Sequence, residues 1–167
     1  QNSLNQLNNA LASGGYSLEI SKNYKFRKPL VVYNHFSESI KEQIISYKNS
    51  LILNENSELT ILNYTDNNSK NNFFVNSFDY LKLKKDSKLK KIFINNNRCS
   101  CYFHNYLKSD LEQNTNLDNY ILSTGLKFNK IDIEINLNEE LAKSSIFSAL
   151  SLSSEEHQEI KSSINHN

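Results

Sequence analysis

The sequence predicts an all-β fold, a right-handed parallel β-helix (solenoid) with a short N-terminal helix. One observation is a repeated phrase: residues 51–59 and 81–89 both read apolar, any, apolar, two polar, Asn or Asp, Ser, any, Leu. Ser57 and Ser87 lie 30 positions apart, and Thr115 marks a weaker copy 28 positions later. The other is a series of short segments, separated by polar breaks, in which apolar and polar residues alternate with a period of two. Such a spacing is typical of stacked coils.

The N-terminal helix is predicted from Leu4, Leu7 and Leu11, which recur at helical spacing. Ser3 suits its start, and Gly14-Gly15 would stop it. We expect residues 1–15 to be the end of an N-terminal helical region. Residues 16–167 are expected to form the β-helix core, truncated at its C-terminal end.

After this helix the chain alternates as strands, and Asn or Asp in the breaks suits tight corners where Gly is scarce. Residues 39–47 fit either a helix or a strand. Polar breaks are expected at 54–57, 66–71, 84–87 and 95–97. Strands are expected at 16–20, 28–35, 50–53, 58–65, 72–83, 88–94, 98–107, 116–123, 130–137, 143–152 and 159–166.

Composition indicates one folded domain and argues against nucleic acid or a membrane as its partner. The 167 residues are 38% hydrophobic and 11% aromatic, which argues against disorder. A net charge of +1 argues against nucleic-acid binding. No apolar run is long enough to span a bilayer and no signal peptide is visible, so we expect no membrane partner and a cytoplasmic location.

The order of several segments resembles the SufB/SufD family, scaffold proteins of the Suf iron–sulfur cluster assembly system. A glycine turn, Ser123-Thr124-Gly125, precedes Asn129-Lys130-Ile131-Asp132-Ile133, and a tail over 156–166 ends in Ile, any residue, His. Residues 7–16, 28–30 and 50–64 resemble the family's entry into the core, its first core strand and one of its coils. The chain is closer to SufD, because the extra cysteine and core segments of SufB are not found.

The resemblance implies a non-catalytic, SufD-like core fragment that supports iron–sulfur cluster assembly. It implies a SufB-like scaffold subunit and a SufC-like ATPase as partners. It also implies no cofactor in this fragment, with an iron–sulfur cluster possible in the full complex and cluster-building residues in later coils.

The sharpest local candidate for a metal site is Cys99-Ser100-Cys101 with His104, since thiolates and imidazole bind iron or zinc. On a straight strand, however, Cys99 and Cys101 share a face with Phe103, and His104 points the other way. We therefore expect the cysteines to fill the interior. Cys99, Cys101 and His166 are retained as metal candidates.

Other charged and titratable residues favour structural roles. His166 would share a face with Ile160, Ser162 and Ile164, where it needs a hydrogen-bond partner. The Glu pairs at 139–140 and 155–156 fall in corners, where adjacent residues are no acid/base pair. A lysine cluster is expected to be a solvated strand face: Lys82, Lys84, Lys85, Lys88, Lys90 and Lys91.

Two alternatives remain open from the sequence. One is a secreted β-helix enzyme acting on polysaccharide, which would need Asp, Arg and Lys aligned on one wall. Only Arg27 and Arg98 are present, far apart in the chain. The other is a structural or adhesive solenoid with no metal role.

Overall fold

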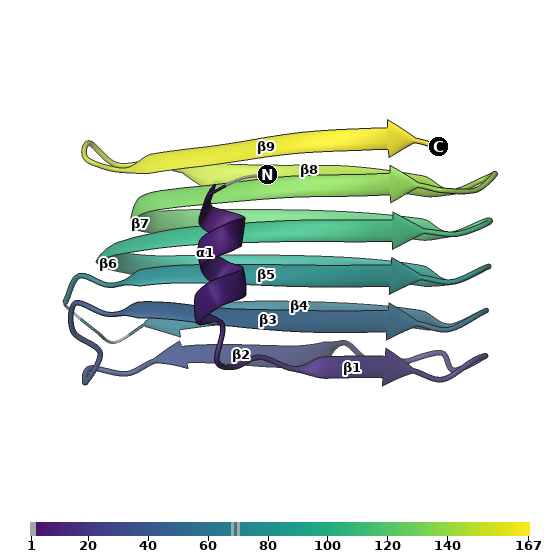
Figure 1. Ribbon diagram of the computed structural model, residues 1–167, viewed down its shortest axis with the longest axis horizontal. Helices are drawn as coiled ribbons and strands as arrows, with labels where there is room; N and C mark the ends of the chain where they lie inside the picture. Colours follow the sequence, from purple (N-terminus) through teal and green to yellow (C-terminus); the bar gives the residue numbers. More distant parts are fainter. Residues whose placement is uncertain (1–2, 68, 70) are drawn as a thin grey trace.

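The structure is a computed structural model that describes residues 3–67, 69 and 71–167, with the side chains of 97–100 outside the description. It is a β-solenoid of about 5 turns carrying one short helix, as the sequence predicts (Figure 1). The elements are α1 (Ser3–Leu11), β1 (Ser17–Ile20), β2 (Leu30–Phe36), β3 (Ile44–Leu53), β4 (Glu58–Asn67), β5 (Phe74–Leu83), β6 (Lys88–Leu111), β7 (Asn116–Leu137), β8 (Lys143–Ser151) and β9 (His157–His166).

The strands form two walls, and every pairing between the named strands is parallel. The first wall contains β2, β4, the first halves of β6 and β7, and β8. The second wall contains β1, β3, β5, the second halves of β6 and β7, and β9. Along each wall, one residue of a strand lies beside its counterpart in the next coil, so side chains form ranks that run along the solenoid.

The repeated phrase marks the corner where each coil passes from the second wall to the first. Its Asn or Asp position has positive φ at Asn56 (54°), Asp86 (61°) and Asn114 (53°). These residues also join neighbouring coils, because Asn56 donates its backbone N–H to Lys85 O and Asp86 donates to Gln113 O, each at 3.0 Å. Asn and Asp are the non-glycine residues that best tolerate left-handed backbone.

The opposite corner differs from the prediction. Residues 95–97 and the Ser123-Thr124-Gly125 turn were expected to break the strands, but β6 and β7 each run through the corner as one long strand. Two register shifts in β6, between Asn96 and Cys99 and between Cys99 and Tyr102, bend it from one wall to the other. A β-bulge bends a strand without ending its pairing, which explains the continuity.

The ambiguous segment 39–47 is no helix: β3 begins at Ile44 and continues through the expected strand 50–53. The helix α1 lies across the strands of the second wall (Figure 1). Its buried side chain is Asn8, while Leu11 of the predicted apolar face remains 46% exposed. Asn8 Nδ2 donates to Asn76 O at 2.7 Å and to Tyr47 O at 3.2 Å. Buried hydrogen bonds therefore fix the helix to β3 and β5.

Candidate functional site: a buried histidine network and an interior ion pair

His104 lies on the outer side of the second wall, beneath α1. The alternation of β6 sends Cys101 and Phe103 into the interior and His104 to the other side, as the period-two pattern predicts. Elsewhere an outward side chain would meet solvent. Here α1 covers the position, so His104 is only 1% exposed.

Both ring nitrogens of His104 face oxygen atoms. Nδ1 lies 2.8 Å from Asn76 Oδ1, and Nε2 lies 3.1 Å from Asp132 Oδ2. Asn76 donates its Nδ2 to Leu4 O of α1 at 2.8 Å, and this bond fixes which amide atom faces the ring. The network therefore links three strands and the helix through one imidazole.

Two influences on the pKa of His104 oppose each other. Burial disfavours the charged ring and lowers its pKa, while the hydrogen bond and negative charge of Asp132 raise it. Burial is the larger influence, so the pKa of His104 lies below its ordinary value of 6.5. A histidine held in this way responds to mild acidification.

The network continues to the surface through Lys130. Lys130 Nζ lies 3.6 Å from Asp132 Oδ1 and 2.6 Å from Glu159 Oε1. The hydrogen bond with Glu159 raises the pKa of Lys130 and lowers that of Glu159. Lys130 and Asp132 belong to the lining of a groove of about 470 Å³, with Asn5, Tyr106, Lys108, Ile133, Glu134, Lys161 and Ser163. The groove offers paired charges of both signs, which suits recognition of a polar surface.

A second polar group lies inside the solenoid. Lys91 of the first wall reaches Asp79 of the second, with Nζ 3.1 Å from Oδ2. Both side chains are nearly buried, at 5% and 7% exposure. Asn49 and Asn105 also donate to the Asp79 carboxylate. The prediction that the whole lysine cluster is a solvated face is therefore wrong for Lys91. Lys91 points inward because it lies on the same face of β6 as Leu89 and Phe93, which pack in the core.

The interior charge affects two neighbouring tyrosines. Burial and the negative charge of Asp79 raise the pKa of Tyr16 and of Tyr47. Each phenol therefore stays neutral. The apolar core consists of two clusters. The larger one surrounds Leu53, Leu83 and Leu111, and the smaller one surrounds Phe36, Phe73 and Phe103.

Of the predicted metal candidates, the structure describes the side chains of Cys101 and His166, which lie on different strands, β6 and β9. Cys101 is fully buried in the aromatic cluster and accepts a hydrogen bond from Asn67 Nδ2. The side chain of Cys99 lies outside the described residues. His166 pairs in register with Leu137 in the last coil, with Ile160, Ser162 and Ile164 on the same face, but it is exposed. Among the described residues no group of three or more His, Cys, Asp or Glu side chains is placed to hold a metal ion.

The remaining candidates lie where the sequence suggests. Glu139 and Glu140 are in one corner and Glu155 in the next. His35 Nδ1 lies 3.7 Å from Asp66 Oδ2 at the surface. The lysines of the cluster other than Lys91 are partly or fully exposed, and Lys88 pairs with Glu58 at 3.5 Å.

Sequence reasoning missed the His104 network, although a signal was present. Asn76, His104 and Asp132 follow one another at intervals of 28 residues, which is the local coil length. Polar residues repeated at the coil period are candidates for contact between coils. The Lys91–Asp79 pair has no such signal, because its partners are 12 residues apart on different walls.

Comparisons with curated proteins and with protein-family models gave different results. None of the curated proteins matches the chain significantly. Within the described residues no helix is long and apolar enough to cross a membrane. A family model described as SUF system FeS cluster assembly, SufBD core domain, matches residues 35–167, which is most of the chain. The chain therefore belongs to the SufBD core-domain family of the SUF iron–sulfur cluster assembly system.

Proposed function

We propose that this chain is the core of a SufD-like scaffold subunit, without catalytic activity of its own, in cytoplasmic iron–sulfur cluster assembly. The observation that carries the proposal is the SufBD core match over residues 35–167 on a parallel β-solenoid. The choice of SufD over SufB rests on the sequence resemblance, in which the extra cysteine segments of SufB are not found.

The partners in this proposal are a SufB-like scaffold subunit and a SufC-like ATPase. A solenoid suits a scaffold because successive coils build extended, rigid walls that present side chains in fixed ranks. The paired charges beside α1 give the second wall a polar surface of this kind. The iron–sulfur cluster is the cargo of the complex, and this chain supplies no cofactor of its own.

The test is co-expression of the full-length protein with the SufB-like and SufC-like proteins of the same genome. We expect the three to co-purify through an affinity tag on this protein. A clean monomer that ignores both partners would overturn the proposal. Cluster formation with the ATPase alone, without a SufB-like subunit, would move the assignment from SufD to SufB.

A second experiment addresses Cys99, Cys101 and His166. We expect a Cys99→Ser/Cys101→Ser variant and a His166→Gln variant to form the complex and to support cluster assembly like the wild type. Loss of iron from the purified complex in either variant would show that the chain itself supplies a ligand.

The polysaccharide alternative has no comparable support, since the family match concerns cluster assembly. Release of reducing sugar from acidic polysaccharides by the purified protein would revive it. Depletion of the full-length protein separates the proposal from a purely structural solenoid, because only a cluster-assembly subunit would lower the activity of iron–sulfur enzymes.

A further inference from the structure

The outer side of the first wall carries an apolar surface that the fold itself leaves uncovered. Two adjacent ranks cross β2, β4, β6, β7 and β8, and each of their ten positions is apolar or aromatic. We call this surface the apolar ladder. The first rank is Val31, Leu62, Ile92, Tyr120 and Phe147, and the second is Tyr33, Tyr64, Ile94, Leu122 and Ala149.

The ladder is exposed at its two ends and at Leu122, and the residues between them, Leu62, Tyr64, Ile92, Ile94 and Tyr120, are half-buried. Val31 is 55% exposed, Tyr33 58%, Leu122 44% and Phe147 49%. Rings of neighbouring coils stack, with centroids 5.4 Å apart for Tyr33 and Tyr64 and 4.8 Å for Tyr120 and Phe147. Contiguous exposed apolar surface of this kind marks an interaction site.

Polar ranks border the ladder on both sides. Thr60, Lys90, Asp118 and Ser145 form one border. His35 and Asp66 begin the other, which Asn96, Thr124 and Ser151 continue. An apolar centre with a polar rim is the ordinary anatomy of a protein interface.

The dimensions of the ladder decide what fits it. Four strand spacings give a length of about 19 Å, and side chains two residues apart along a strand give a width of about 7 Å between ranks. A globular partner needs roughly 800 Å² on each side for a stable interface. The ladder alone is smaller than such an interface, and its long, narrow outline matches one α-helix of about 13 residues, with a diameter near 10 Å.

The fold already contains such an arrangement. On the second wall, α1 lies across the strands rather than along them (Figure 1). That wall is covered through polar contacts of Asn8, Asn76 and His104. The ladder offers apolar contacts instead, so its helix must be amphipathic, with apolar residues at i, i+3 or i+4, and i+7.

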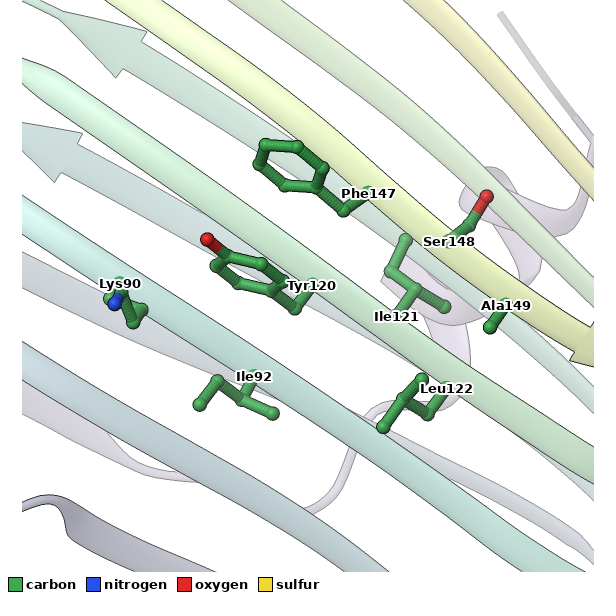
Figure 2. Close-up of a pocket in the computed structure, with 8 residues that line it drawn as sticks. All are labelled: Lys90, Ile92, Tyr120, Ile121, Leu122, Phe147, Ser148 and Ala149. Carbon is green, nitrogen blue, oxygen red and sulfur yellow. The ribbon is translucent and has the colours of Figure 1, made fainter.

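One end of the ladder adds a charge preference. A hollow of about 450 Å³ lies there, between Ile92, Tyr120, Leu122, Phe147 and Ala149 (Figure 2). Lys90 borders this hollow, with Nζ 5.8 Å from the centre of the Tyr120 ring. A cation at the rim of an apolar hollow favours an acidic side chain on the helix that fills it.

We propose that the apolar ladder binds one amphipathic α-helix of a partner protein, lying across β2, β4, β6, β7 and β8 with an acidic residue toward Lys90. The proposal goes beyond the assembly role above and holds for a SufD-like or a SufB-like subunit alike.

Photo-crosslinking in the full-length protein in cells tests this, with p-benzoylphenylalanine in place of Phe147 and, as a control, in place of the exposed Glu19 of β1 on the second wall. Crosslinked peptides are identified by mass spectrometry. We expect the Phe147 position, and not the control, to crosslink a partner segment with the helical apolar spacing. A crosslink to another copy of the ladder, to a segment of the same chain, or to no protein would overturn the proposal.

A matched pair of variants measures the contribution of the ladder. Leu122→Asp places a charge in the second rank, and Asn96→Asp places the same charge on the exposed polar border. We expect Leu122→Asp to reduce the crosslink at least ten-fold and Asn96→Asp to leave it within two-fold, with unchanged circular dichroism for both. Equal effects of the two variants would overturn the proposal.

Discussion

Lys91 and Asp79 form an ion pair across the interior of the solenoid, with Nζ 3.1 Å from Oδ2 and both side chains almost fully buried. Removing one partner of a buried pair leaves the other charge without compensation, which costs far more than the pair contributes. Lys91→Met is therefore expected to lower the free energy of unfolding by about 3–5 kcal/mol, measured by urea denaturation.

Two comparisons identify the cause of that loss. Lys88→Met removes an exposed partner of Glu58 and should cost no more than about 1 kcal/mol. Adding Asp79→Asn to Lys91→Met should recover part of the stability, because the amide carries no charge and its oxygen still accepts from either Asn49 or Asn105. If the double variant is as unstable as Lys91→Met, the buried charge is not the cause.

Leu141 occupies the corner position that Asn or Asp holds in earlier coils, with φ of 62° and 66% of its surface exposed. Left-handed backbone costs a residue with a bulky side chain about 1–2 kcal/mol, and Asn less. Leu141→Asn should therefore raise the free energy of unfolding by about 1 kcal/mol. The reverse exchange, Asn114→Leu, should lower it, and a stabilising effect of that exchange would contradict the corner rule.

Gly15 connects α1 to the first coil with φ of 128°, and a Cβ there would lie 1.7 Å from Lys48 O. Gly15→Ala should lower the free energy of unfolding by about 1–3 kcal/mol through backbone strain alone. It should also speed hydrogen exchange in α1, because Lys48 N donates to Gly14 O beside it.

The neighbouring glycine is the matched control, since a Cβ at Gly14 meets no atom within 4 Å. Gly14→Ala should change stability by no more than about 0.5 kcal/mol. Equal effects of the two substitutions would show that the close approach to Lys48 is not what requires glycine.

The lowered pKa of His104 predicts a loss of stability in mild acid. Its folded pKa lies below the unfolded value of 6.5, so the unfolded chain binds more protons once the pH falls below that value. Stability should be unaffected by this group above pH 6.5 and should decline below it, by at most about 1.4 kcal/mol per pH unit.

His104→Gln removes this titration and should flatten the decline between neutral pH and pH 5, measured as unfolding free energy at each pH. Carboxylates with a lowered pKa, such as Glu134 beside Tyr106 and Lys108, lose their contribution to stability at a lower pH than His104 does. They therefore do not affect the comparison of the two slopes. An unaltered slope in His104→Gln would exclude this histidine as the sensor.

The predicted strands largely match the observed ones because alternation and corner chemistry are local properties. Leu81 and Leu83 alternate with Lys82, and Asp86 adopts the left-handed backbone its position in the phrase requires. The continuous passage of β6 was not predictable, because residues 95–97 read as a polar break. Asn95 is fully buried, and only pairing with β4 and β7 keeps this polar stretch in a strand.

The sequence by itself determined the coils, since its repeated phrase specifies corners through the left-handed tolerance of Asn and Asp. It also determined that His104 and Cys101 face opposite sides of their strand. Only the tertiary structure decided which side is covered: α1 returns over β5 and encloses His104, while the first wall leaves its apolar ladder open. It likewise decided that Lys91 points inward to Asp79, because the two walls meet only when the coil closes.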